Sequence, residues 1–183
     1  MVQKILTAAV VALVVASGAA SAATITKNGT TANTNTASFA IGDDLTFTDA
    51  LSPNDGISLY SFTFTATQRA VVSFIALAAT GVSSGADIKN IRFGYNSPPS
   101  QSFSTPIVLP GGSAFATGSL MSFTINKGSS FSVYFSEVQQ LLKTVGVTGS
   151  FTVAAVPIPA TLPIFASALG LLGLARRRRS SQV

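Results

Sequence analysis

The segment from residue 57 to residue 66 reads Ile57-Ser58-Leu59-Tyr60-Ser61-Phe62-Thr63-Phe64-Thr65-Ala66. Its aromatic side chains occupy alternate positions, and Ser and Thr fill the places between them. A period of two puts these two sets on opposite faces of an extended chain. The segment is therefore predicted to be a β-strand with one apolar and one polar face.

A turn precedes this strand, and a second strand follows it. The turn reads Ser52-Pro53-Asn54-Asp55-Gly56, and its Pro and Asn-Asp-Gly residues favour a tight reversal of the chain. Residues 70–78 are more apolar and follow the short connection Gln68-Arg69. We expect the strands at 57–66 and 70–78 to pair as a hairpin.

Further strands are predicted along the rest of the chain, with Gly and Pro turns between them. Residues 23–37 form an edge strand or a loose lead-in. The later strands span residues 44–48, 88–95, 119–125, 129–135 and 149–155, and 103–109 pairs briefly. The strands at 119–125 and 129–135 flank Asn126-Lys127-Gly128 and are predicted to form a second hairpin. Strands at this spacing indicate an all-β fold, an antiparallel β-sandwich of jelly-roll type.

One short helix is predicted within residues 136–144. Ser136 would cap it, and Gly146 would end it. Val138, Leu141 and Leu142 would form its apolar face.

Residues 1–22 have the three parts of a secretory signal peptide. Lys4 supplies the positive start, residues 5–16 are apolar, and small residues follow up to position 22. Ala20 and Ala22 fit the A-x-A cleavage pattern, so we expect signal peptidase to cut between Ala22 and Ala23. An uncleaved membrane anchor is the alternative, although the apolar run is short for a span.

Residues 156–183 form a second, differently built tail. It starts with Val156-Pro157-Ile158-Pro159-Ala160, continues with an apolar stretch at 163–175, and then carries Arg176, Arg177, Arg178 and Arg179. We expect a short transmembrane helix at 163–175, and the Arg cluster would stop transfer on the cytoplasmic side. A buried core helix followed by a solvated basic tail is the alternative.

This tail resembles the PEP-CTERM class of bacterial sorting signal, in the variant whose motif reads Val-Pro-Leu-Pro-Ala. Val156, Pro157, Pro159 and Ala160 match that motif, and Ile158 replaces Leu. Ile158 also departs from the Glu of the Pro-Glu-Pro form. The resemblance implies a transient membrane anchor, processing by an exosortase-like membrane protease, and release to the cell surface or outside the cell.

A second resemblance concerns the domain between the two ends. Some PEP-CTERM proteins carry a Phe-x-Asp-x-Phe motif before a strand-rich domain. Phe47 and Asp49 match its first two positions, and Leu51 occupies the third. This resemblance supports the all-β fold and implies nothing further.

The net charge of +5 comes from the ends of the chain. Lys4 and the four Arg residues of the tail account for it, because the remaining Lys and Arg residues equal the Asp and Glu residues in number. Residues 23–155 are therefore neutral, and no nucleic-acid partner is expected, since such binding requires a basic surface.

Catalytic and metal-binding residue types are few in this chain. It has no Cys and no His, which excludes disulfides, thiolate metal sites and His-dependent catalysis. Asp43, Asp44, Asp49 and Asp55 lie close in sequence and could form a calcium site, but solvated turn carboxylates are the simpler interpretation. Glu137 is the only Glu, and nothing marks a partner for acid–base chemistry. We assign no catalytic residue, no metal ligand and no cofactor.

Two further features concern sugars. Tyr60, Tyr95 and Tyr134 could stack on sugar rings, although packing in the core is the simpler interpretation. Asn28-Gly29-Thr30 has the pattern of an N-glycosylation site.

These observations predict a signal peptide at 1–22, a secreted domain at 23–155 and a sorting tail at 156–183. We expect a bacterial surface or extracellular-matrix protein with a non-enzymatic structural or adhesive role. A carbohydrate-binding module acting on exopolysaccharide is the alternative, and a secreted hydrolase is the second.

Overall fold

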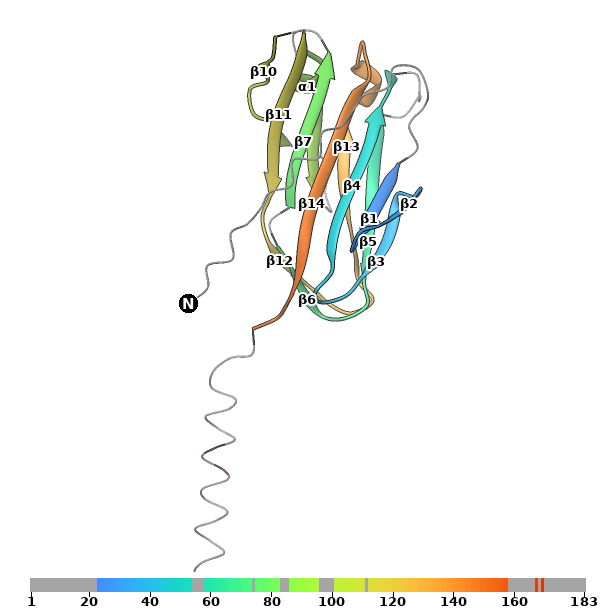
Figure 1. Ribbon diagram of the computed structural model, residues 1–183. Coiled ribbons are helices and arrows are strands. Elements are labelled where there is room, and N and C mark those ends of the chain that lie inside the picture. Colours follow the sequence, from blue (N-terminus) through green and yellow to red (C-terminus); the bar gives the residue numbers. More distant parts are fainter. Residues whose placement is uncertain are drawn as a thin grey trace, which may run out of the picture.

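The computed structural model describes residues 23–53, 58–73, 75–82, 86–95, 101–110 and 112–157, together with Ser167 and Leu169. Within these residues the chain is built almost entirely of β-strands, which form two sheets (Figure 1). The all-β prediction is therefore confirmed.

The larger sheet contains nine strands within the described ranges, and all of their pairings are antiparallel. The order along its main path is β10 (Ile107–Val108), β11 (Ser113–Leu120), β7 (Ile75–Val82), β14 (Val145–Ala155), β4 (Asp44–Leu51), β1 (Thr24–Lys27) and β2 (Thr30–Ala32). Two short strands complete the sheet, since β6 (Ala70–Val72) pairs with both β12 (Phe123–Ile125) and the end of β14.

The smaller sheet has five strands. Their order is β3 (Thr36–Phe39), β5 (Leu59–Ala66), β13 (Ser130–Ser136), β8 (Arg92–Tyr95) and β9 (Gln101–Ser102). Its pairs are antiparallel except for β3 and β5, which run parallel. One short helix, α1 (Ala86–Asn90), precedes β8, and a 3-10 turn, η2 (Val138–Gln140), follows β13.

The alternation of residues 57–66 is realised in β5. Phe62, Phe64 and Ala66 are fully buried, whereas Ser61 and Thr63 face the outer side of the smaller sheet. Because the sheet is covered on one face only, the period of two in the sequence becomes the inside and the outside of the sheet.

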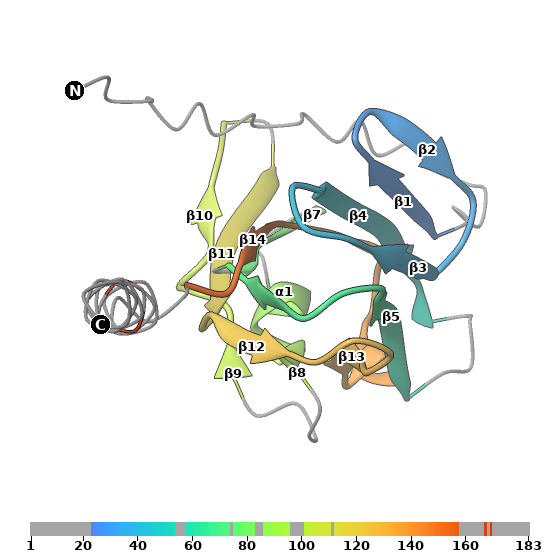
Figure 2. The same ribbon diagram turned by 90° about the horizontal axis from the view of Figure 1, so that it is seen from below.

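Phenylalanine rings from both sheets meet in one core. The ring centroid of Phe47 on β4 lies 4.7 Å from that of Phe62 on β5. Phe151 on β14 lies 5.0 Å from Phe64, which also stacks on Phe131 of β13 at 5.3 Å. Figure 2 shows the two sheets as two layers, and these side chains lie between them. The sheets therefore face each other across a shared hydrophobic core.

Both predicted hairpins are wrong. Strand β5 pairs with β3 and β13 and does not pair with residues 70–78, which divide into β6 and β7 of the other sheet. Likewise β12 pairs with β6, whereas β13 lies in the smaller sheet. Alternation shows which side chains face the core, but strands that face each other across a core have the same pattern as strands that lie side by side. The chain crosses between the sheets at both places.

Two shorter segments also differ from expectation. The predicted strand at 88–95 begins only at Arg92, because the residues before it form α1 and bury Ile88 and Ile91. The predicted helix within 136–144 is reduced to η2.

The details of that helix prediction are corrected as well. Ser136 ends β13 and is not a cap; Glu137, with a positive φ of 66°, precedes the turn and makes no side-chain cap bond. Val138 and Leu141 are buried as expected, but Leu142 is 85% exposed. Gly146 lies inside β14, so it does not end the helix.

The predicted signal peptide at 1–22 lies outside the described residues. So does the predicted transmembrane helix at 163–175, apart from Ser167 and Leu169. No helix within the described ranges has the length and hydropathy of a membrane span.

Candidate functional site

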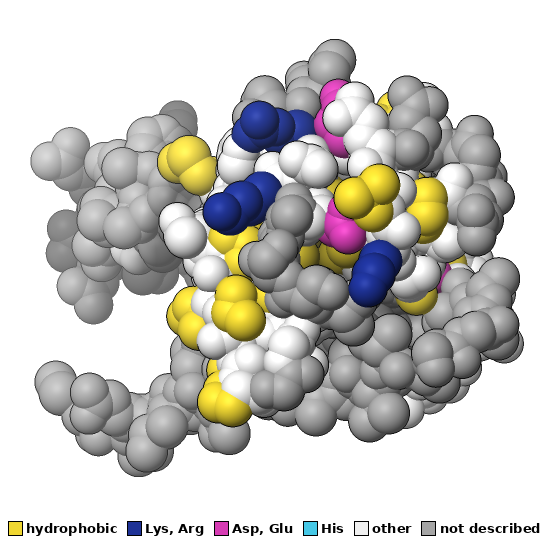
Figure 3. Space-filling model, turned by 90° about the horizontal axis from the view of Figure 1, so that it is seen from above, with side chains coloured by type: hydrophobic (Ala, Val, Ile, Leu, Met, Phe, Trp, Pro, Cys, Tyr) yellow, Lys and Arg dark blue, Asp and Glu magenta, His cyan; other side chains and the backbone are white. Residues whose placement is uncertain are grey.

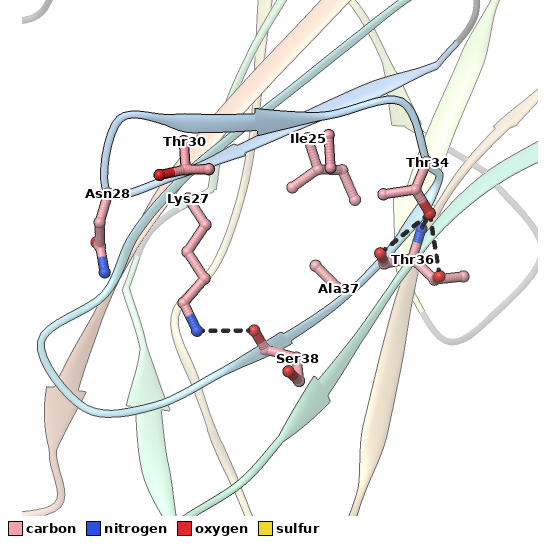
Figure 4. Close-up of a pocket in the computed structure, with 9 residues that line it drawn as sticks. Ile25, Lys27, Asn28, Thr30, Thr34, Thr36, Ala37 and Ser38 are labelled. Atoms are coloured by element: carbon pink, nitrogen blue, oxygen red, sulfur yellow. Dashed lines mark hydrogen bonds between the residues drawn. The ribbon is translucent and has the colours of Figure 1, made fainter.

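A hollow of about 460 Å³ opens between the β1–β2 hairpin and strand β3 (Figure 4). The hairpin belongs to the larger sheet and β3 to the smaller one, so the hollow lies where the two sheets separate at one edge of the domain. Nine residues line it: Ile25, Lys27, Asn28, Thr30, Ala32, Thr34, Thr36, Ala37 and Ser38.

The local sequence explains why the hairpin forms. Asn28 and Gly29 both adopt positive φ angles, 49° and 84°, and they join β1 to β2. A two-residue turn of this kind matches the twist of antiparallel strands and favours Asn-Gly. It brings Lys27 opposite Thr30 and Ile25 opposite Ala32, which places all four residues at the hollow.

The hollow has apolar and polar parts. Ala32 and Ala37 supply most of its apolar surface, because Ile25 is only 2% exposed. The hydroxyl-bearing residues Thr30, Thr34, Thr36 and Ser38 stand around them. In Figure 4, Lys27 and Asn28 lie at one end and Thr34 and Thr36 at the other.

Two of these hydroxyls are already engaged. The Thr34 and Thr36 hydroxyl oxygens lie 3.2 Å apart, and the Thr34 hydroxyl also accepts from the backbone N–H of Thr36 at 3.1 Å. Within the described part of the chain, the hydroxyls of Thr30 and Ser38 have no protein partner. The Thr30 hydroxyl is therefore available to a ligand in the hollow, whereas the Ser38 hydroxyl points to the opposite face of β3 from Ala37.

Lys27 links the hollow to a buried carboxylate. Its Nζ lies 2.8 Å from Oδ2 of Asp43 and donates to the backbone carbonyl of Ser38 at 3.1 Å. Asp43 is only 8% exposed. It also accepts from Nδ2 of Asn28 and from the backbone N–H of Ala40, each at 2.7 Å. The carboxylate thus joins the β1–β2 turn to the corner between β3 and β4.

These contacts change the acidity of Asp43. Burial by itself raises the pKa, but the hydrogen bonds from Lys27, Ala40 and Asn28, with the positive charge of Lys27, outweigh it. The net result is a pKa of Asp43 below its ordinary value. A carboxyl that stays ionised and fully hydrogen-bonded is suited to holding structure together, and it is a poor general acid.

The structure does not gather the other aspartates around Asp43. Asp44 is exposed at the start of β4, whereas Asp49, five positions later, is buried on the core-facing side of the same strand. Asp55 lies outside the described residues. Among the residues that the structure describes, no three metal-ligating side chains come together.

The three tyrosines have different environments. Tyr60 packs against the core and meets Phe62 in a T-shaped, edge-to-face contact at 5.4 Å between ring centroids, and Tyr95 stacks on Phe123 at 4.7 Å. Tyr134 is partly exposed on the outer face of the smaller sheet, where its strand neighbours are Ser61 and Gly94. Two of the three therefore take the core position that was the simpler interpretation.

Both polar atoms of the Asn28 side-chain amide form hydrogen bonds within the domain. Its nitrogen donates to Asp43, and its oxygen accepts from the backbone N–H of Asp44 at 2.9 Å. N-glycosylation would modify that nitrogen and break the contact with Asp43.

The residues predicted for export and sorting lie at the ends of the described domain. Ala23 packs against the core just before β1, and Val156 and Pro157 directly follow β14. Ala20, Ala22, Ile158, Pro159, Ala160 and Arg176, Arg177, Arg178 and Arg179 lie outside the described residues.

Charges on the described surface are few. Figure 3 shows Lys and Arg side chains interspersed with Asp and Glu at one end of the molecule, without a patch of one sign. At the hollow, Lys27 and Asp43 balance each other.

Sequence reasoning did not find the hollow. Asn28-Gly29 does indicate a hairpin turn, but the hollow needs a third strand from the other sheet, and nothing in the sequence brings β3 next to that hairpin. Comparison with protein-family models, curated proteins and solved structures finds no match to this chain.

Proposed function

We propose that this chain is a secreted surface or extracellular-matrix protein with a non-enzymatic, structural or adhesive role. Signal peptidase removes residues 1–22, and the tail at 156–183 acts as a PEP-CTERM-like sorting signal for an exosortase-like protease. Residues 23–155 then form the working domain, a jelly-roll-like β-sandwich. The C-terminal helix holds the protein in the membrane only until the tail is processed.

One observation carries this proposal: the strands fit between the two predicted processing sites. Strand β1 begins at Thr24, one residue after the predicted signal cleavage. Strand β14 ends at Ala155, immediately before the proline motif. Removal of both ends would therefore cut none of the strands that the structure describes, as a sorting mechanism that delivers a folded domain requires.

The surface chemistry supports a role in a polysaccharide matrix. The outer face of the smaller sheet is rich in hydroxyls, and Thr63 with Ser132 and Thr65 with Ser130 form cross-strand hydrogen bonds at 2.8 Å. A neutral, hydroxyl-bearing surface can lie close to sugar chains. It has no excess of positive charge that would attract polyanions.

The carbohydrate-binding module is kept as a second candidate because of the hollow between β1, β2 and β3. Its apolar surface and surrounding hydroxyls suit a polyhydroxylated ligand. A hydrolase is less supported, since the most buried carboxylate of this region, Asp43, is fixed by Lys27 and Asn28.

The proposal is tested by mass spectrometry of the protein isolated from its own host, with both mature termini identified. An N-terminus at Ala23 and a C-terminus within residues 156–160 would support export and sorting. An intact tail through residue 183 would contradict the sorting step and leave a membrane-tethered protein. An intact signal segment would contradict secretion by the proposed route.

A further inference from the structure

We propose that the hollow between β1, β2 and β3 binds one neutral sugar unit of a polysaccharide. This inference gives the proposed matrix function a partner, and it rests on that function for the choice of a polymeric ligand. Sugar binding in solution is a property of the folded domain, however, and can be measured whether or not the protein is exported.

The hollow offers contacts for both the apolar and the polar parts of a sugar ring. A pyranose presents C–H groups on its faces and hydroxyls around its rim. Ala32 and Ala37 offer an apolar contact for the former, and the Thr30 hydroxyl and the Lys27 ammonium group offer polar contacts for the latter. A volume of about 460 Å³ lies within the range of about 300–1,000 Å³ that is usual for small-molecule sites.

Hydrogen-bonding capacity remains at both sides of the hollow. The hydroxyl of Thr30 on β2 can donate and accept, and the backbone carbonyl of Ser38 on β3, which accepts from Lys27, has a second lone pair. Lys27 stands between them, and its ammonium group has three N–H donors, of which Asp43 and the Ser38 carbonyl use two. The remaining donor can reach a ligand hydroxyl without loss of the ion pair.

The charge at the hollow favours a neutral sugar over an acidic one. Lys27 would attract a uronate or a phosphate if it stood alone. Its charge is matched by Asp43 at 2.8 Å, and that carboxylate stays ionised because its pKa is lowered. An anionic ligand would therefore gain little attraction from Lys27 and would meet the nearby negative charge of Asp43.

The surroundings of the hollow favour a polymer over a free monosaccharide. Strand β3 belongs both to the hollow and to the outer face of the smaller sheet. Two rows of hydroxyl-bearing residues run from it across the neighbouring strands, in register: Thr36, Thr63 and Ser132, and then Ser38, Thr65 and Ser130. A sugar chain that leaves the hollow over β3 meets these rows.

Calorimetric titration of the full chain tests the proposal. The protein is purified in a zwitterionic detergent, because a glycoside detergent would compete for the site. Short gluco-, manno- and galacto-oligosaccharides are titrated, with an oligo-uronate as the charged comparison. We expect at least one neutral series to bind and the oligo-uronate to bind more weakly.

Two variants at the hollow test whether binding occurs at this site or non-specifically elsewhere on the surface. Thr30→Val removes the available hydroxyl from an exposed strand position and should weaken binding about tenfold. Ala32→Leu narrows the hollow from the exposed strand β2 and should abolish binding. The matched control is Thr124→Val on β12, an exposed strand position away from the hairpin in Figure 2, and it should leave the affinity unchanged. Equal melting temperatures verify that all variants are folded.

Three outcomes would overturn the proposal. One is that no neutral oligosaccharide binds the wild-type chain. A second is that the oligo-uronate binds more tightly than every neutral series. A third is that binding persists in the hollow variants but disappears in Tyr134→Ala, which would place the sugar on the outer face of the smaller sheet. None of these outcomes bears on the mature termini, so the export proposal stands or fails separately.

Discussion

Gly149 of β14 and Phe47 of β4 are register partners in neighbouring strands, and the ring of Phe47 occupies the space that a side chain at position 149 would take. A Cβ atom on Gly149 would overlap Cζ of Phe47 and lie 2.7 Å from Cδ2 of Leu77. Phe47 in turn packs on Phe62 of the opposite sheet. The absence of a side chain at one strand position thus allows the central aromatic contact between the sheets.

Gly149→Ala should therefore destabilise the domain, although Ala suits a regular strand better than Gly does. We expect a loss of about 1–3 kcal/mol in the free energy of unfolding, because Phe47 or the strand must shift to make room. Urea unfolding of residues 23–155, with and without the substitution, measures this loss.

The double variant Gly149→Ala with Phe47→Leu provides the control. Leu is shorter than Phe, so the alanine methyl should be tolerated better on this background, and the two substitutions should couple by at least about 0.5 kcal/mol. A fully additive pair, or an unchanged stability of Gly149→Ala alone, would show that the ring of Phe47 does not restrict position 149.

Asp43→Asn tests the carboxylate that joins the β1–β2 turn to the β3–β4 corner. Its folded-state pKa lies below the unfolded value, so its contribution to stability is fully present above about pH 4. The contribution is lost as the pH falls through the lower, folded-state pKa. At pH 7 the variant should be less stable than wild type by about 1–3 kcal/mol, because charge-assisted bonds from Lys27 and Asn28 are weakened.

Unfolding free energies across a pH series check this prediction. The gap between wild type and Asp43→Asn should narrow in strongly acidic solution, where Asp43 itself is protonated. Asp44→Asn is the matched control at the neighbouring exposed position, and it should change stability by no more than about 0.5 kcal/mol. A gap that stays constant with pH would mean that the charge of Asp43 does not contribute.

Much of the strand content follows from the sequence, and strand pairing does not. The alternating residues of β5 mark its core-facing positions correctly, and the strand predicted around residues 44–48 is part of β4, since both depend on local sequence patterns. The partners of β5 are β3 and β13. Val133 of β13 pairs with Phe62, and no local sequence signal spans such a separation. The role of Gly149 was hidden for the same reason, because it depends on which strand lies beside β14.

The contacts of the candidate site could not be predicted from the sequence either. Sequence proximity grouped Asp43 with Asp44, Asp49 and Asp55, but neighbours along a strand point to opposite faces. The ion-pair partner of Asp43 is Lys27 at the end of β1, whereas Asp43 itself lies between β3 and β4. The hollow arises from the separation of two sheets, which only the folded chain reveals.

Residues 23–155 should fold alone and should not depend on metal ions or on redox conditions. The chain has no Cys, and the carboxylates that the structure describes are dispersed or hydrogen-bonded. We expect the same melting temperature with and without a chelator or a reductant. A melting temperature lowered by chelator would contradict this prediction and return attention to the segment from Asp43 to Asp55.

The Arg cluster of the tail should determine how the C-terminus is processed. Replacement of Arg176, Arg177, Arg178 and Arg179 by Gln removes the positive charges that would hold the end of the chain on the cytoplasmic side. We therefore expect the tail to be trimmed poorly, and less protein to reach the cell surface, as measured by intact-mass analysis and surface labelling in the host.

The fourfold Arg→Lys variant keeps the charge, so it should be processed normally if the processing machinery recognises charge alone. Failure of the Lys variant would instead indicate that the processing machinery recognises the guanidinium groups. Normal trimming and display of the Gln variant would contradict the sorting function of this cluster.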